Sequence, residues 1–467
     1  MKEIFIIKGL VFIIAPNEDG LGTSAWCVRL IKELSHQKCI SKIKVIVSSD
    51  NLQEYHKHKY SDLKILVEVI RLNYISNKIK LVKNLTGSLN ISETIKKTIL
   101  SYQKSKYEYI NEIRNKKILK DVDVIVDLGV PQLVRAAYEE NLERKKKLQK
   151  EIYLITFFDH AWSFSLRNII SSEKSTILDK DIEEALLEMN LDESLTKEVI
   201  IFNEPISPKI YYNYWKELIG HSPKVIPGCL GGPLATLEYF KNHNIQRLEK
   251  EIKRKNEYSQ YIYEMAHLTA KKMVGIDNQL DTLFISGGGT TVWDEVLENL
   301  IDDYANNEPN YNVLIFSPTE VKKRNIRLRS RDYIKCGHYK HDKLVFLSVG
   351  NTFTETHHVL FPAFDLVLTR AGGGTVNDAI ACRVPLVLVE EPFMWQVEQI
   401  RKSCIKLRIA EGVSLKKFQE NPRRCVELQN GKLKILNKQE ENILRIPNHS
   451  ETWLVQKLIN LVYTKSF

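Results

Sequence analysis

Short apolar runs that alternate with longer helical patterns are the feature that most limits the folds open to this chain. Turn residues flank the runs, and the segments between them repeat apolar residues at helical spacing. Strands buried on both faces of a parallel sheet read as continuous apolar runs, joined by right-handed βαβ units. The pattern therefore predicts an α/β protein with two doubly wound parallel sheets. The expected strands are Ile4–Ile14, Ile43–Val47, Ile65–Leu72, Val122–Val126, Ile152–Phe158 and Val199–Phe202 in the first half, and Thr282–Ile285, Asn312–Phe316, Lys343–Leu347, Leu366–Thr369 and Leu386–Val389 in the second.

A stretch dense in proline and glycine separates the two halves. Residues 203–233 contain five prolines and four glycines, which is typical of a connection between domains. We expect a Rossmann-like N-terminal domain at 1–235, with a basic helical insertion at 71–120, and a second Rossmann-like domain at 236–449. A last helix at 450–467 would be free to pack back onto the first domain. Two such domains leave a cleft between the carboxyl ends of their sheets, where open α/β sheets bind ligands.

The formal charge of +10 is concentrated in one segment. Residues 71–120 contain twelve Lys and Arg against three Glu, a net charge of +9, so the rest of the chain together is close to neutral. Ile95, Ile99, Tyr102 and Ile110 recur there at helical spacing, which predicts an amphipathic helix with a basic outer face. This face is either a solvated lysine-rich surface or a contact for an anionic partner, such as a membrane or an acidic acceptor. Nucleic acid is not expected, because the chain has no RNP-like signature, zinc finger or aromatic-interleaved basic motif.

The cysteines and the apolar runs indicate the cellular compartment of the protein. The seven cysteines are scattered and never form a C-x-x-C pair, which argues against a disulfide framework or a structural zinc site and favours a reducing compartment. The chain has no run of about 18 apolar residues, so no transmembrane helix is expected. Glu3 and Lys8 interrupt the apolar N-terminus, unlike a signal peptide. We expect a cytoplasmic protein, peripheral at the inner membrane face if the basic segment binds lipid.

Three glycine-bearing turns each follow an expected strand and precede an expected helix. They are Asp19–Ser24, Ser286–Thr291 and Arg370–Thr375. Glycine lets the backbone approach a ligand closely, and free N–H groups at a helix start attract anions. The last two turns could face one diphosphate, although each alone could be a plain structural turn. None has the Walker or full G-x-G-x-x-G pattern, so ATP and nicotinamide cofactors are not favoured.

The sequence around the third turn resembles a known pattern. The run from Phe364 reads Phe-Asp-Leu-Val-Leu-Thr-Arg-Ala-Gly-Gly-Gly-Thr-Val-Asn-Asp-Ala-Ile-Ala-Cys-Arg-Val-Pro-Leu-Val-Leu-Val-Glu-Glu-Pro. It resembles the donor-binding region of GT-B glycosyltransferases, most closely the group of the peptidoglycan N-acetylglucosaminyltransferase and the diacylglycerol glycosyltransferases. The resemblance covers residues 280–405. It implies a hexosyltransferase that uses a nucleotide sugar, expected to be a UDP-sugar, and needs no metal ion or cofactor, with the acceptor bound by the N-terminal domain.

The resemblance also implies roles for individual residues. The glycine turns and their threonines would bind the phosphates, and Asp378 would bind the ribose hydroxyls, a role that the family usually gives to Glu. Gln396 or Gln399 would bind hydroxyls of the transferred sugar, and the spacing does not decide between them. The backbone at 349–351 would face the base. The implied donor-binding residues are Gly288, Gly289, Thr290, Arg370, Gly372, Gly373, Gly374, Thr375, Asp378, Gln396 and Gln399.

Two positions depart from the family pattern. Arg383 stands where a glycine usually occurs before the x-Pro. The acceptor-side loop contains Gly20, Gly22 and Thr23, and Thr23 takes the place of a histidine that commonly assists inverting transfer. A neutral threonine cannot act as a base near pH 7.

The base for an inverting transfer must then come from elsewhere. Asp159 and His160 follow the strand Ile152–Phe158 and are expected beside the cleft, Asp19 in the first loop competes with them, and Asp127 is a further candidate. Each of these side chains could instead only cap a helix or bond to a turn.

Other conspicuous side chains are expected to have structural roles. We expect His357 and His358 on a helix surface rather than on a metal, and Trp162 and Trp293 in packing. Because Thr23 replaces the histidine, two alternatives stay open beside transfer. One is a nucleotide-sugar hydrolase or 2-epimerase of the same fold, and the other is a noncatalytic nucleotide-sugar-binding protein.

Overall fold

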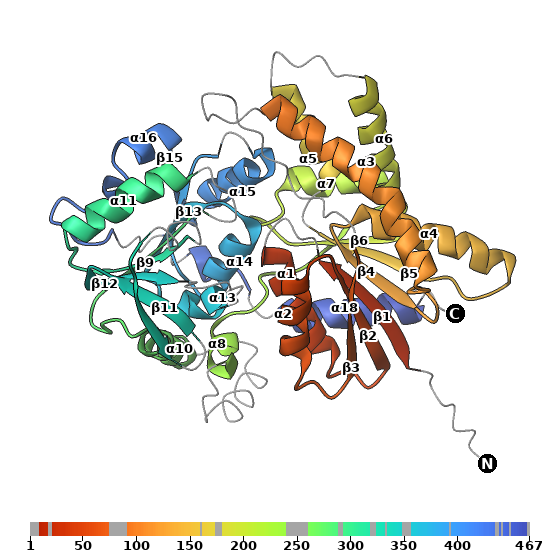
Figure 1. Ribbon diagram of the computed structural model, residues 1–467, viewed down its shortest axis with the longest axis horizontal. Coiled ribbons are helices and arrows are strands. Elements are labelled where there is room, and N and C mark those ends of the chain that lie inside the picture. The colour runs from red at the N-terminus through yellow and green to blue at the C-terminus, as the bar shows by residue number, and fades with distance from the viewer. Residues whose placement is uncertain are drawn as a thin grey trace.

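A computed structural model of the chain contains two α/β domains, each built on its own sheet (Figure 1). The described residues are 9–16, 21–73, 91–158, 161–172, 180–239, 260–287, 293–317, 324–331, 334–347, 356–391, 394–434, 439, 442–447 and 450–464.

The N-terminal sheet is doubly wound and entirely parallel. Its seven strands lie in the order β3-β2-β1-β4-β5-β6-β7, so the chain starts in the middle and winds outward in both directions. Its strands are β1 (Leu10–Pro16), β2 (Ile40–Val47), β3 (Leu66–Arg71), β4 (Val124–Leu128), β5 (Tyr153–Phe157), β6 (Glu198–Ile201) and β7 (Lys224–Val225). Its helices are α1 (Leu21–Leu34), α2 (Asp50–Tyr60), α3 (Ile91–Asn115), α4 (Pro131–Lys146), α5 (Trp162–Ser172), α6 (Lys180–Ser194) and α7 (Lys209–Ile219).

The C-terminal sheet has eight strands in the order β10-β11-β12-β9-β8-β13-β14-β15. Each adjacent pair in the part β12-β9-β8-β13-β14-β15 is parallel. The strands of this sheet are β8 (Thr282–Ser286), β9 (Asn312–Phe316), β10 (Arg327–Arg331), β11 (Ile334–Tyr339), β12 (His341–Leu347), β13 (Leu366–Arg370), β14 (Leu386–Val389) and β15 (Ala410–Val413). The remaining helices are α8 (Pro233–Tyr239), α10 (Gln260–Val274), α11 (Asp294–Asn306), α13 (Thr356–Leu360), α14 (Gly373–Ala381), α15 (Trp395–Lys406), α16 (Leu415–Glu420) and α18 (Ser450–Thr464), with 3-10 turns at Phe361–Ala363 and Arg423–Cys425.

The predicted architecture is confirmed, with one difference at the edge of the second sheet. Every expected strand overlaps an observed one, but β10, β11 and β12 pair in antiparallel fashion instead of extending the parallel sheet. The sequence of β10, Arg-Leu-Arg-Ser-Arg, alternates cations with other residues because an edge strand is not buried on both faces.

The predicted amphipathic helix is present as α3, which packs against α4 and α6. Ile95, Ile99, Tyr102 and Ile110 are buried. The exposed face of α3 is mixed rather than strongly basic, because Lys97, Lys104 and Arg114 share it with Glu108, Leu100 and Tyr107. Lys106 points inward and forms ion pairs of 2.6 Å with Asp192 and 2.7 Å with Glu188. Within the described residues, no helix combines the length and the apolar character needed to cross a bilayer. All seven cysteines are free thiols.

The last helix returns to the first domain. α18 lies against α1 (Figure 1), where the hydroxyl of Thr452 donates a hydrogen bond of 3.1 Å to Glu33. Leu454, Val455 and Leu458 on α18 are fully buried. This helix is thus part of the packing of the N-terminal sheet, although it follows the second domain in sequence.

Candidate functional site

The two glycine turns of the second domain leave strands that are neighbours in the sheet. β8 pairs in parallel with β13, with Ser286 opposite Thr369, and the Thr369 hydroxyl donates a bond of 2.8 Å to the Ser286 carbonyl. Loops that leave adjacent parallel strands open at the same edge of the sheet and can share a ligand. Of the β8 turn, only Ser286 and Gly287 are described, so Gly288, Gly289 and Thr290 lie outside the described residues.

The first turn of α14 is open to solvent at this edge. Gly372 is its N-cap residue, no side chain among the described residues caps it, and a Cβ added to Gly372 would meet no atom within 4 Å. Gly373, Gly374 and Thr375 are partly exposed. The helix therefore presents backbone N–H groups and the positive end of its dipole to solvent at this edge of the sheet, which suits a phosphate.

Asp378 lies one turn further along α14 and is already engaged. It is only 3% exposed and accepts a hydrogen bond of 2.8 Å from the Arg29 guanidinium, which reaches it from α1 of the other domain. The neighbouring Asn377 donates a further bond of 3.0 Å to the same carboxylate. Burial alone would raise the pKa of Asp378, but the charges of Arg29 and His358 outweigh it and hold that pKa well below its ordinary value.

His358 does not lie on the helix surface where the sequence places it. Its ring Nδ1 contacts the second carboxylate oxygen of Asp378, and the side chain is nearly buried. The surface prediction is wrong for His358 because α13 packs against α8 and α10, which bury one side of this short helix. The described part of the chain holds no group of three or more His, Cys, Asp and Glu side chains arranged to bind a metal ion.

The connection between the domains is tied to the same carboxylate. Arg29 also donates a bond of 3.0 Å to the Leu230 carbonyl, and Asn377 bonds to both the N–H and the carbonyl of Leu230. α1, the interdomain segment and α14 thus form one buried polar junction beneath the open end of α14. Neither Arg29 nor Leu230 belongs to a motif, so nothing in the sequence points to this role.

Arg370 is the last residue of β13, and Glu391 follows the neighbouring strand β14. Their charged groups lie 3.9 Å apart, and Arg370 also contacts the sulfur of Met394. Burial lowers the pKa of Arg370, and the Glu391 charge only partly offsets this. Both side chains are buried at the edge where the glycine turns open, and Glu391 was not singled out from the sequence.

The two candidate glutamines differ in their surroundings. Gln396 is buried in the first turns of α15, and its backbone carbonyl accepts a bond of 3.0 Å from the Tyr211 hydroxyl of the N-terminal domain. Its side-chain oxygen has no hydrogen-bond partner among the described residues. Gln399 lies one turn later and is half-buried. The roles of both glutamines stay predictions.

The departure at Arg383 leaves the turn geometry unchanged. Arg383 has φ 61°, and the N–H groups of Arg383 and Val384 bond back to Ile380 and Ala379. This is the Schellman pattern that glycine usually completes. The guanidinium lies 3.8 Å from the ring centre of Tyr263, a cation–π contact that helps to hold a non-glycine residue there.

On the N-terminal side, Gly22 and Thr23 fall in the first turn of α1, and Thr23 is half-buried. Asp19, Gly20, Asp159, His160 and the backbone at 349–351 lie outside the described residues, so their roles stay predictions.

Asp127 is described and is almost fully buried at the end of β4. It accepts a bond of 2.5 Å from the Val130 N–H, and burial raises its pKa to about 7. Close to it, Glu193 of α6 accepts bonds from the N–H of Trp162 and the hydroxyl of Ser163, both of 2.5 Å. Burial, with the Asp127 charge adding to it, raises the pKa of Glu193 to about 8. A small cavity lies between them.

The tryptophans pack as predicted. Trp293 lies in the core of the second domain against Phe418, with ring centres 4.6 Å apart. Trp162 packs on Phe158 in the first domain and donates to the Gly129 carbonyl.

No family model matches the chain, and no curated protein matches it in sequence. Solved structures match over nearly its whole length. UGT2 of Phytolacca americana, in complex with UDP-2fluoro-glucose and pterostilbene, aligns with a TM-score of 0.55 at 11% identity, over 97% of this chain and all of its own.

Two further structures agree. A UDP-glucosyltransferase from Polygonum tinctorium aligns with a TM-score of 0.54 at 12% identity, over 97% of this chain and 98% of its own. The calicheamicin glycosyltransferase CalG4 gives 0.53 at 12% identity, over 98% and 99%. These likenesses establish that the chain has the two-domain GT-B fold.

Proposed function

We propose that the protein is a GT-B glycosyltransferase that moves a hexose from a UDP-sugar to an acceptor without a metal ion. The observation that carries the proposal is the open N-terminus of α14, set beside the β8 turn at the cleft edge of a GT-B fold. The likeness of Phe364–Pro392 to the group of the peptidoglycan N-acetylglucosaminyltransferase and the diacylglycerol glycosyltransferases supports the finer assignment.

The donor half of the reaction would need few charged side chains. When the bond between sugar and diphosphate breaks, negative charge grows on the leaving phosphate. The free N–H groups and the dipole at Gly372–Thr375 are positioned to stabilise it. The hydroxyl of Thr375 would add a hydrogen bond, and the buried Arg370 would add a positive charge at the end of β13.

The acceptor half needs a base for the attacking hydroxyl. We keep Asp159, His160 and Asp19 as the candidates, because they follow strands whose carboxyl ends face the cleft. Asp127 has a pKa near neutrality, which suits a base. Its bonds to backbone at the start of α4 and its burial nevertheless favour a structural role.

The proposal includes the partner of the basic segment. The exposed cations of α3 support a peripheral contact of residues 71–120 with an anionic membrane, where a lipid-linked or anionic acceptor would be met. This contact would place the protein in the cytoplasm at the inner membrane face.

The test is turnover of UDP-sugars with and without candidate acceptors. Release of UDP that depends on an acceptor supports transfer, and release without one supports the hydrolase or 2-epimerase alternative. Binding of UDP without turnover supports the noncatalytic alternative. If neither UDP nor any UDP-sugar raises the Tm, the donor assignment fails.

A further inference from the structure

The end of α4 places a leucine in a backbone conformation that glycine normally takes. Leu148 has φ 54°, its N–H bonds to the Lys145 carbonyl at 3.1 Å, and the Gln149 N–H bonds to the Arg144 carbonyl at 2.9 Å. These two bonds form a Schellman motif, with Leu148 at the left-handed position. A β-carbon is disfavoured in this conformation, so leucine does not stabilise the backbone at this position.

Leu148 gains nothing from burial either, because its side chain is 96% exposed. Among the described residues, four other helices end in the same bonding pattern: α10 has Gly275 at the left-handed position, and the other three have Lys117, Arg383 and Arg408 there. A cation at that place interacts favourably with the helix dipole, whereas leucine does not. An apolar side chain that folding disfavours in two ways indicates a contact outside the folded chain.

The turn that carries Leu148 is firmly held. The Arg144 guanidinium donates to the carbonyls of Leu119 at 2.7 Å, Val122 at 2.9 Å and Lys150 at 3.1 Å. Leu148 therefore projects from an ordered base. Four lysines next to it in sequence are exposed, as are Glu143, which pairs with Lys146, and Glu151, which pairs with Lys197. We call this set the lysine-turn surface: Lys145, Lys146, Lys147, Leu148 and Lys150.

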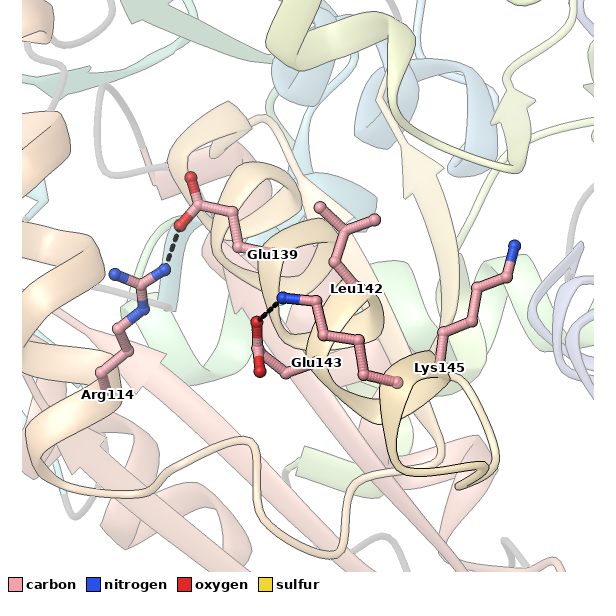
Figure 2. A pocket seen from close by; sticks show the side chains of 6 residues that line it. Arg114, Glu139, Leu142, Glu143 and Lys145 are labelled. Atoms are coloured by element: carbon pink, nitrogen blue, oxygen red, sulfur yellow. Dashed lines mark hydrogen bonds and ion pairs between the residues drawn. The ribbon is translucent and has the colours of Figure 1, made fainter.

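The surface continues onto α3 through a groove. The groove lies between the last turns of α4 and the end of α3, and Leu142, 44% exposed, is one of the residues that line it (Figure 2). Its two carboxylates are already paired, Glu139 with Arg114 and Glu143 with Lys146. The unpaired charge that the groove presents is thus positive. The groove is lined by Arg114, Glu139, Leu142, Glu143, Lys145 and Lys146.

We propose that the lysine-turn surface docks the protein on an anionic lipid bilayer, with Leu148 entering the interface and the lysines contacting lipid phosphates. Lysines surrounding an exposed apolar side chain match a surface with anionic headgroups above an apolar layer. A nucleic acid would satisfy the lysines but leave Leu148 and Leu142 in water. This inference rests on the proposed function, whose membrane contact it assigns to the end of α4 as well as to α3.

The experiment is sedimentation of the full chain with sucrose-loaded vesicles. Vesicles of phosphatidylcholine with phosphatidylglycerol are compared with pure phosphatidylcholine, at low and high salt. The variants are Leu148→Ser and Lys145→Glu/Lys147→Glu. The matched control is Leu191→Ser, because Leu191 is also exposed (61%) but lies on α6 beside the acidic Glu184 and Glu188.

We expect the protein to bind the anionic vesicles at low salt and to bind pure phosphatidylcholine much less. Leu148→Ser should lower the partition coefficient about tenfold, as loss of a buried leucine side chain does. Lys145→Glu/Lys147→Glu should lower it by more, and Leu191→Ser should leave it unchanged. Because Leu148 is exposed, its variant should melt no lower than the parent.

Three results would overturn the inference. They are absence of binding to anionic vesicles, equal binding to pure phosphatidylcholine, and binding that Leu148→Ser leaves intact, which would indicate a contact made by charge alone, as with nucleic acid. The UDP-induced rise in Tm is measured on the same samples. Its loss with vesicle binding intact would reject the proposed function and not the docking surface, and the reverse pattern would reject only the docking surface.

Discussion

Arg29 of α1 and Asp378 of α14 form a buried ion pair of 2.8 Å across the two domains. The residue that the sequence resemblance assigns to the ribose thus also forms an ion pair between the N-terminal and the C-terminal domain. Both side chains are largely buried, so each compensates the charge of the other in a place that water reaches poorly.

Removal of Arg29 should be costly for this reason. Arg29→Ala leaves the Asp378 carboxylate buried with His358 and Asn377 as its side-chain partners among the described residues, and we expect a loss of about 3–5 kcal/mol of stability. Denaturant unfolding measures the loss. Arg29→Lys keeps the charge, so its free energy of unfolding should fall less than that of Arg29→Ala. Equal losses in the two variants would show that the ion pair does not stabilise the protein through charge compensation.

Asp378→Ala should weaken UDP binding as well as stability. If the carboxylate accepts bonds from the ribose hydroxyls, its loss should reduce affinity at least about tenfold, as expected for a hydrogen bond to a charged group. Isothermal titration calorimetry at a temperature where the variant is still folded separates the loss of affinity from the loss of stability. Affinity unchanged in a folded variant would remove Asp378 from the ribose role.

Thr375 offers a test of the phosphate role with little cost to the fold. The residue is half-buried in the first turn of α14. Thr375→Val should lower UDP affinity about tenfold, because a hydrogen bond to a phosphate is lost. Thr375→Ser keeps the hydroxyl and should bind nearly as the parent does. Equal affinity of the valine and serine variants would contradict this role.

The carboxyls of Asp127 and Glu193 should make stability fall as pH rises. Folding raises both pKa values, to about 7 and about 8, so the protonated forms are favoured in the folded state. Their contribution is complete below about pH 4 and is lost as pH rises through 7 and 8. Asp127→Asn should remove about 3 kcal/mol of this dependence between pH 5 and 8.

The measurement is Tm across that pH range for the parent and Asp127→Asn. Asp181→Asn, on the exposed face of α6, is the matched control and should follow the parent curve. Parallel curves for all three proteins would show that Asp127 ionises in the folded state as readily as in the unfolded one.

Leu148→Gly should raise stability, whatever it does to lipid binding. The left-handed backbone of Leu148 favours glycine, and the exposed side chain contributes no burial, so we expect a gain of about 1 kcal/mol. A rise of about 2–4 °C in Tm corresponds to this gain. A lower Tm would mean that the leucine side chain stabilises the turn through contacts in the free protein.

The fold could be predicted because its central strands are buried on both faces. Asn312–Phe316 and Leu386–Val389 have the expected boundaries, since a strand covered by helices needs apolar residues along its whole length. The strand Arg327–Arg331 could not be predicted in this way, because it is an edge strand and its sequence is not an apolar run. Arginine at alternate positions is also common in loops. Ala410–Val413 escaped for a similar reason, with Glu and Gly at its centre.

Only those features of the site that lie within one short segment of the sequence could be predicted. The adjacency of the two glycine turns follows from strand order, and the open start of α14 follows from its glycines. The partners of Asp378 do not, because Arg29 and His358 reach it from helices that carry no motif pointing to it. Glu193 likewise meets Asp127 through the packing of α6, which no residue spacing specifies.

The return of α18 to α1 makes the first domain discontinuous along the chain. Leu454 and Leu458 cover apolar residues of a domain whose last sheet strand ends at Val225, and the whole C-terminal domain is inserted between that strand and α18. A fragment that stops at residue 235 would therefore expose the side of α1 that α18 covers, and association in solution is the usual result of such exposure. To obtain the first domain alone, residues 450–464 must be joined back to it by a short linker.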